Sequence, residues 1–225
     1  MDFKKKTMKV IFFCVIFFVC IPAVIYLLSY IPFRDNSGNS MIKQAFDNQK
    51  TMFNYHSDLV ATHYFASPFY EWPLIIRPIW YYSGVLSDSL REGISSFGNP
   101  LVWWVGIPAF LYMIYLAIRK KDLRACFLII GYLAQYLPWF FVERLTFIYH
   151  YFPSVVFLVL MIGYAFRNLK EVLPKKGYYI TLITYAICVF GLFLLFYPVL
   201  SGQPVELSFA VKYLKWFKNW ILVAS

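Results

Sequence analysis

The sequence contains little charge, and acidic residues are especially scarce. Asp, Glu, Lys and Arg make up 14% of the 225 residues, with 11 acidic residues against 21 basic ones. Hydrophobic residues make up 61% of the chain and aromatic residues 22%, which is too apolar for a soluble domain of this length. The composition therefore excludes an ordinary soluble protein and favours a membrane protein.

Motifs for several common chemistries are also missing. The four cysteines all lie in apolar stretches, and none has a metal-ligand spacing, so a disulfide framework or zinc site is not expected: Cys14, Cys20, Cys126 and Cys188. The chain has no glycine-rich nucleotide-binding loop and no serine nucleophile elbow. The sequence therefore gives no indication of a nucleotide-binding site.

Five stretches contain no charged residue at all, and each is 18 to 24 residues long: 10–30, 100–118, 125–142, 147–166 and 177–200. A helix needs about 20 residues to cross the hydrocarbon core of a bilayer. We therefore expect an all-α polytopic integral membrane protein with about five transmembrane helices in a single membrane domain, 1–225. The first apolar run is too long for a signal-peptide core, which indicates a retained span.

Positive charge is concentrated beside alternate ends of these stretches. Segments 1–9, 119–124 and 167–176 hold 12 of the 21 Lys and Arg residues in 25 positions. Basic segments stay in the cytoplasm, so we expect a cytoplasmic N-terminus, an external C-terminus and an external active side. Because the clusters are short and adjoin spans, they favour contact with anionic membrane lipid over binding of nucleic acid.

The large external loop, 31–99, has a pattern of its own. Between Met41 and Val60, apolar residues recur near helical spacing, which predicts an amphipathic helix lying at the membrane interface. Pro68, Pro73 and Pro78 then prevent a continuous helix, so an interfacial or re-entrant segment is expected, followed by polar turns over 83–99. Asn99 and Pro100 form a helix start for the second span. We expect residues 201–225 to form an interfacial tail.

Polar residues that could carry chemistry gather in the external loop. His56, Asp58 and His63 have types that could hold a divalent metal, but the spacing is weak evidence, and we expect substrate contact and no cofactor. Glu71 and Arg77 either pair with each other or leave Arg77 free for bidentate contact with a lipid phosphate.

A second polar group lies between the third and fourth spans, where Glu143, Arg144, Tyr149 and His150 occur within eight positions. His150 is the only histidine within a predicted span, and ionisable groups inside the membrane are costly, which makes His150 a functional candidate. The alternative is a neutral imidazole that is hydrogen-bonded between helices.

Three runs of sequence together resemble a known family. The runs HSDLVATHYFASPFYEWPLIIRP, FGNPLVWW and ERLTFIYHYFP, in this order, resemble the C-terminal membrane region of protein O-mannosyltransferases, of the GT-C class of glycosyltransferases. The resemblance implies transfer of mannose from polyprenyl- or dolichyl-phosphate mannose to Ser or Thr hydroxyls of an acceptor protein. It also implies a binding role for two sets of residues: His56, His63, Glu71, Arg77, Arg144 and His150 for acceptor and lipid phosphate, and Trp72, Trp80 and Tyr149 as aromatic contacts to sugar or lipid.

One feature of that family is missing. Its catalytic acidic pair, Asp-Glu, belongs to an earlier external loop, and this chain contains no Asp-Glu dipeptide. The catalytic residues are therefore unknown, and we expect a companion N-terminal half to supply them. Two alternative hypotheses remain: a related transferase that uses another lipid-linked sugar, and a non-catalytic membrane scaffold or transport subunit.

Overall fold

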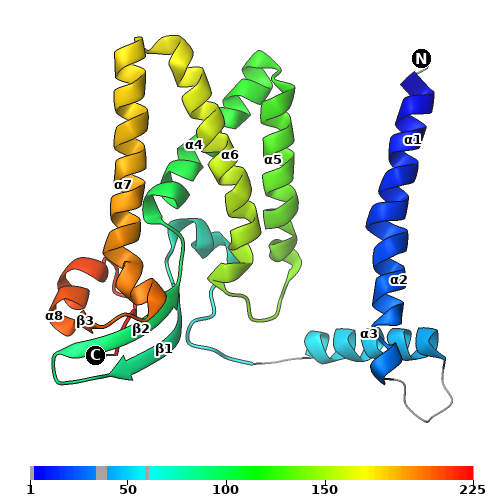
Figure 1. Ribbon diagram of the computed structural model, residues 1–225, viewed down its shortest axis with the longest axis horizontal. Helices are drawn as coiled ribbons and strands as arrows, with labels where there is room; N and C mark the ends of the chain where they lie inside the picture. The colour runs from blue at the N-terminus through cyan, green and yellow to red at the C-terminus, as the bar shows by residue number, and fades with distance from the viewer. Residues whose placement is uncertain (1–2, 34–39, 59–60, 225) are drawn as a thin grey trace. The chain divides into compact units, whose positions relative to one another are not determined.

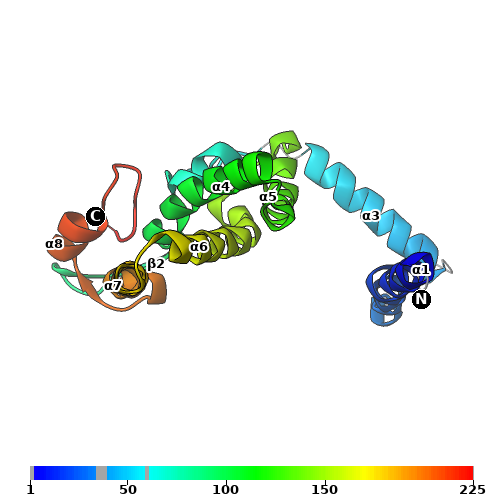
Figure 2. The same cartoon turned by 90° about the horizontal axis from the view of Figure 1, so that it is seen from above.

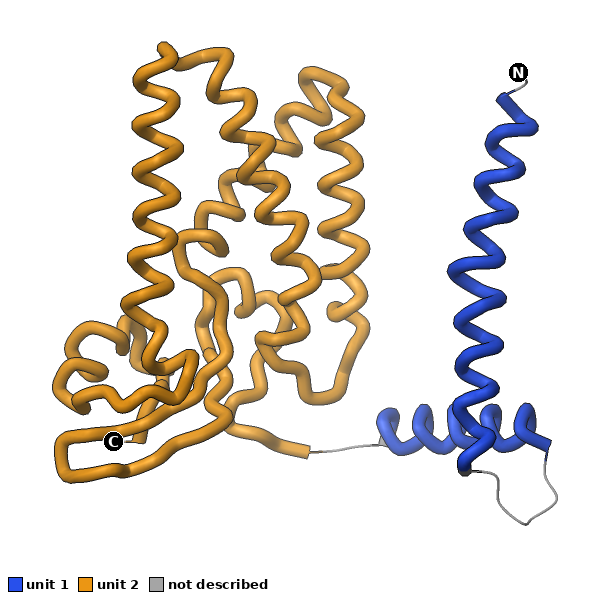
Figure 3. The backbone as a smooth tube through the Cα atoms, in the orientation of Figure 1, with its two compact units in different colours: residues 1–60 blue, residues 61–225 orange. Residues whose placement is uncertain are grey.

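The structure, a computed structural model, describes residues 3–33, 40–58 and 61–224. Its contacts divide the chain into two compact units, residues 1–60 and 61–225, which Figure 3 colours separately. The single membrane domain that the sequence predicts stays a prediction.

Five helices within the described ranges are long and apolar enough to cross a membrane: Phe3–Leu28, Pro100–Lys120, Leu123–Phe141, Ile148–Val172 and Lys175–Ser201. They coincide with the five uncharged stretches of the sequence, which confirms the multi-pass helical architecture. The chain is an integral membrane protein.

The first unit consists of a spanning helix and a separate amphipathic one. The spanning helix comprises α1 (Phe3–Val15), the π-helical turn η1 (Ile16–Cys20) and α2 (Ile21–Leu28), and the short 3-10 turn η2 (Ile31–Phe33) follows. The π turn comes directly before Pro22, which has no N–H to donate to the preceding turn.

The predicted amphipathic helix of the external loop is present as α3 (Met41–Asp58). Ala45 is buried, while Ile42, Phe46 and Phe53 are exposed. Its location at a membrane interface stays a prediction.

The second unit contains the other four spans. These are α4 (Pro100–Lys120), α5 (Leu123–Tyr136) with its 3-10 extension η4 (Leu137–Phe141), α6 (Phe152–Val172) preceded by the 3-10 turn η5 (Ile148–Tyr151), and α7 (Lys175–Ser201). Helices α4, α5 and α6 pack against one another, and α7 lies beside α4 and strand β2, as Figures 1 and 2 show.

The turn between α4 and α5 is set by local signals. Lys121 ends α4 in the left-handed region at φ 53°, and the Asp122 carboxylate accepts hydrogen bonds from the first N–H groups of α5. At the other end of α4, the predicted cap is confirmed, since the Asn99 side chain accepts from the N–H of Leu101 at 3.1 Å. Both boundaries follow from residues within a few positions.

A small antiparallel sheet corrects the all-α expectation and the expected polar turns over 83–99. It has the order β1 (Ile79–Val85), β2 (Leu90–Ser96), β3 (Val205–Glu206). In β2 the buried positions are Arg91, Gly93 and Ser95. Because these are not large apolar residues, the sequence shows none of the alternation by which a half-buried strand is recognised. The fold is mainly helical with one sheet.

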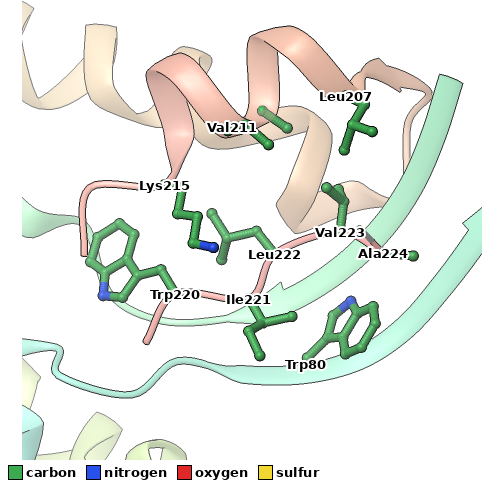
Figure 4. Close-up of a pocket in the computed structure, with 10 residues that line it drawn as sticks. Trp80, Leu207, Val211, Lys215, Trp220, Ile221, Leu222, Val223 and Ala224 are labelled. Carbon is green, nitrogen blue, oxygen red and sulfur yellow. The ribbon is translucent and has the colours of Figure 1, made fainter. Parts of the chain in front are cut away.

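The C-terminal segment packs closely on this sheet. A Cβ atom at Gly93 would lie 2.1 Å from the carbonyl oxygen of Leu222, so only glycine permits this approach. Figure 4 shows the segment passing between the hairpin and the turns of α8 (Leu207–Phe209) and the π turn η6 (Ala210–Leu214). Trp220 is fully buried there. Leu222 and Val223 are buried with it, whereas Val211 and Phe217 are exposed, and the expected place of residues 201–225 at the membrane interface stays a prediction.

Candidate functional site

Two segments far apart in the sequence are joined at one end of the second unit. The Ser67 N–H donates to the Thr146 carbonyl at 2.9 Å, and the Thr146 hydroxyl donates to the Ser67 carbonyl at 2.8 Å. Both residues are buried. These bonds fix the loop that follows Ala61 against the connection between α5 and α6.

Trp72 supports this junction from within the 3-10 helix η3 (Phe69–Leu74). Its side chain is completely buried, and its indole Nε1 donates to the Ser67 carbonyl at 3.1 Å and the Ser67 hydroxyl at 3.0 Å. The Trp72 ring is stacked on His150, with centroids 6.0 Å apart. Trp72 thus packs under His150, and its predicted contact with sugar or lipid stays a prediction.

The His150 ring is held among aromatic rings. Its centroid lies 4.3 Å from that of Trp139 and 4.4 Å from that of Tyr149. The Phe147 N–H donates to His150 Nδ1 at 3.0 Å. His150 Nδ1 also lies 2.9 Å from the Phe147 carbonyl oxygen, to which it donates in the other tautomer, so both contacts with Phe147 use Nδ1 and neither uses Nε2.

His63 meets the same phenylalanine from the other segment. Its ring packs edge-on against Phe147 at 5.2 Å, and its Nδ1 accepts from the Phe65 N–H at 3.2 Å. Tyr149, which is exposed, stacks on Phe147 at 5.6 Å. The structure thus brings together one group, here called the histidine–aromatic cluster: His63, Trp72, Trp139, Phe147, Tyr149 and His150.

Arg77 braces the loop that carries His63. Its Nη1 donates to the carbonyls of Tyr64 and Ala66, at 3.1 and 3.0 Å. The Oε2 atom of Glu71 is buried without a hydrogen-bond partner, so Glu71 does not pair with Arg77 through this oxygen. One nitrogen of the Arg77 guanidinium therefore holds the loop. Within the described ranges, the structure shows no protein acceptor for the other two nitrogens.

The same loop contains a strained residue. Ile75 has φ 55°, a left-handed conformation that is costly for a β-branched side chain, and it is fully buried. Its carbonyl accepts a hydrogen bond of 2.7 Å from the indole Nε1 of Trp220. The C-terminal segment therefore helps to hold the loop in this conformation.

Three further residues of the predicted site are not counted in the cluster: His56, Arg144 and Trp80. His56 belongs to α3 in the first unit, Arg144 is exposed, and the Asp58 side chain lies outside the described residues. Trp80 packs on Phe65 and lines a cavity of about 380 Å³ with Lys215 and Trp220, shown in Figure 4. Among the described side chains, no group of three or more His, Cys, Asp or Glu residues could hold a metal ion.

Four residues of this site were not singled out by the sequence reasoning: Ser67, Trp139, Thr146 and Phe147. Each is an ordinary residue type whose role depends on a contact with a distant segment. The runs that carry the family resemblance contain Ser67, Thr146 and Phe147, and this was the only signal available for them.

Comparisons with known proteins agree on one family. Residues 41–220 match the family described as the C-terminal four TMM region of protein-O-mannosyltransferase. A polyprenol-phosphate-mannose–protein mannosyltransferase of Mycolicibacterium smegmatis is 24% identical over 227 residues, covering 84% of this chain and 43% of that protein. Protein O-mannosyltransferase 1 of Drosophila pseudoobscura pseudoobscura is 25% identical over 202 residues, covering 76% of this chain and 22% of that protein.

A solved structure shares the fold. The S. cerevisiae protein O-mannosyltransferase Pmt1-Pmt2 complex bound to the sugar donor matches with a TM-score of 0.72 and 22% identity, covering 84% of this chain and 28% of the matched one. The chain spans less than half the length of these relatives. Because the family match extends over more than half of its residues, the chain belongs to the family of C-terminal four-helix membrane regions of protein O-mannosyltransferases.

Proposed function

We propose that this chain binds the lipid-linked donor and the acceptor in a protein O-mannosyltransferase that uses polyprenyl- or dolichyl-phosphate mannose. The observation that supports this proposal most directly is a junction between two distant segments. Hydrogen bonds between Ser67 and Thr146 join these segments, and His63 and His150 both contact Phe147 there. The names of the relatives support the donor class, because they include both polyprenol- and dolichyl-phosphate-mannose enzymes.

The chemistry of the cluster suits a lipid phosphate. His150 contacts Phe147 through Nδ1, and its Nε2–H is proposed to donate to the phosphate, while Arg77 carries further N–H groups beyond the Nη1 that braces the loop. A phosphodiester oxygen is an anionic acceptor, and hydrogen bonds to charged acceptors are stronger than neutral ones. Tyr149 is exposed beside His150 and offers a ring face to the sugar or lipid.

In the proposed reaction, the hydroxyl oxygen of an acceptor Ser or Thr attacks C1 of mannose. The bond between C1 and the phosphate oxygen breaks, and the lipid phosphate leaves with the bonding electron pair. A carboxylate takes the hydroxyl proton. Donors placed around the phosphate stabilise the negative charge that develops on the leaving group, and this is the role proposed for His150, His63 and Arg77.

The carboxylate is proposed to come from a companion polypeptide. The Asp-Glu pair of the family is not found in this sequence, and the chain spans only part of its relatives. Mannose transfer is therefore expected only from the assembled enzyme.

The cluster is proposed to face the outside of the cell membrane. It lies at the ends of α5 and α6 opposite to the basic segments 119–124 and 167–176. Basic segments resist translocation, which puts the cluster on the side where lipid-linked mannose would be presented.

The test is transfer of mannose from polyprenyl-phosphate mannose to a Ser/Thr peptide by the enzyme assembled with its companion. His150→Phe keeps an aromatic ring against Trp72 and Trp139 but removes the donor, so it should lower transfer about tenfold or more. Tyr70→Phe, at an exposed residue of η3, is the control and should leave transfer unchanged. Full activity of His150→Phe would remove the proposed role, and preferential use of another lipid-linked sugar would favour a related transferase.

A further inference from the structure

A groove runs between α5 and α6 near the basic segments, far from the histidine–aromatic cluster. It has a volume of about 590 Å³. Its lining combines apolar side chains with two cations and includes Arg124, Phe127, Val159, Gly163, Tyr164 and Arg167. Three of its apolar side chains are at least half exposed: Phe127 at 69%, Val159 at 52% and Leu160 at 50%. The groove is therefore largely apolar, and it is open to lipid in a membrane-spanning part of the chain.

Gly163 leaves room in this groove. A Cβ atom built there would meet no atom within 4 Å. Glycine in a helix interior costs about 0.5–1 kcal/mol relative to alanine, and no contact within the described residues requires one at this position. The absence of a side chain at Gly163 therefore widens the groove in the middle of α6. It does not serve close packing against another helix.

Two arginines contribute positive charge to the groove. Arg167 lies over the Tyr164 ring at 5.8 Å, while Arg124 bonds to the Tyr164 side chain and attracts the Asp122 carboxylate. The nearby Asp122 carboxylate is occupied, because it accepts from the N–H groups of Arg124 and Ala125 and from the Tyr164 hydroxyl at 2.5 Å. Two guanidinium groups thus border one apolar groove.

We propose that this groove binds an anionic phospholipid, with its phosphate between Arg124 and Arg167 and an acyl chain along Phe127 and Gly163. Charge complementarity carries the choice of occupant, because cations beside an apolar groove fit an anionic headgroup with a hydrocarbon tail.

The site is distinct from the one proposed for the lipid-linked donor. His150 and Arg167 are 17 positions apart along η5 and α6, which corresponds to about 25 Å at the rise of a helix. One phosphate cannot contact both. The inference therefore stands or falls independently of the proposed transferase function.

The test is native mass spectrometry of the full chain titrated with phosphatidylglycerol and, separately, with phosphatidylcholine. The wild-type chain should retain phosphatidylglycerol selectively. Arg124→Gln should weaken its binding about fivefold and the double variant with Arg167→Gln about thirtyfold. Gly163→Leu, which fills the groove, should abolish selective retention.

Two matched controls separate this site from diffuse attraction. Lys175→Gln with Lys176→Gln removes two exposed charges from the same end of the helices but outside the groove, and binding should persist. Gly191→Leu places the same side chain on α7, where a Cβ also meets no atom within 4 Å, and should leave binding intact.

Three results would overturn the proposal. The first is an equal loss in the lysine double variant, which would mean non-specific charge attraction. The second is unchanged binding by both Gly163→Leu and the arginine double variant. The third is displacement of phosphatidylglycerol by polyprenyl phosphate with the same dependence on Arg124, which would assign the groove to the donor.

Discussion

The two ends of the four-helix unit are held together in different ways. The cluster end, which carries the histidine–aromatic cluster and the hairpin, is closed by buried hydrogen bonds between distant segments, such as Thr146 to Ser67 and Trp220 to Ile75. The basic end, formed by residues 119–124 and 167–176, is held by the local Asp122 cap together with a part-buried bond from the Tyr164 hydroxyl to Asp122. The end proposed to carry chemistry is therefore the one held by buried bonds between distant segments.

The largest effect should come from removing the central ring of the cluster end. Trp72→Ala deletes a fully buried side chain that contacts Ser67, Trp139 and His150, so it should lower the free energy of unfolding by about 3–5 kcal/mol. Unfolding in mixed micelles would measure this. Tyr70→Ala, at the exposed neighbouring ring, should cost about 0.5 kcal/mol or less. Equal losses in the two variants would show that the cluster is not a packed unit.

Two tryptophans allow a direct comparison of a long-range hydrogen bond with a local one. Trp220→Phe leaves the buried Ile75 carbonyl without its donor and should cost about 1–3 kcal/mol. Trp216 makes a bond of similar length, 2.8 Å, but to Tyr213 three residues away and near the surface. Trp216→Phe should therefore cost clearly less. The opposite order, measured by the same unfolding experiment, would contradict the importance of the contact between the C-terminal segment and the loop.

A pair of threonines gives a smaller contrast. Thr146→Val removes one hydroxyl bond to the Ser67 carbonyl, which keeps its bond from Trp72, so the expected cost is about 1 kcal/mol. Thr181→Val removes a bond to Gly177 within the same exposed helical turn and should be close to neutral. Mannose transfer should fall in the first variant only. A drop in both would point to a general effect of threonine loss.

The smallest effect concerns pH and the basic end. The hydrogen bond from the Tyr164 hydroxyl, together with the N–H groups of α5, holds the pKa of Asp122 below its usual value. A lowered pKa means that ionised Asp122 stabilises the fold above the unfolded value of about 3.9 and that this contribution is lost as pH falls through the folded value. Asp122→Asn should therefore flatten the pH dependence of the unfolding temperature below about pH 4. An unchanged profile would contradict the assignment.

The difference between local and long-range contacts also determines which features the sequence can predict. The spans, the Asn99 cap and the amphipathic α3 depend on composition, period and neighbouring residues, and all are present in the structure. The hairpin escaped prediction because its buried positions carry Arg91, Gly93 and Ser95. His63, Glu71, Arg77 and His150 were singled out by residue type and by the family resemblance, whereas the contacts that position them join segments that no local pattern connects.

The most direct test is binding of polyprenyl-phosphate mannose to this chain alone, reconstituted in lipid nanodiscs without any companion. The account predicts saturable binding that His150→Phe weakens about tenfold or more, because one hydrogen bond to the phosphate is lost. Equal affinity of the wild-type and His150→Phe chains would contradict the claim that the histidine–aromatic cluster holds the donor phosphate.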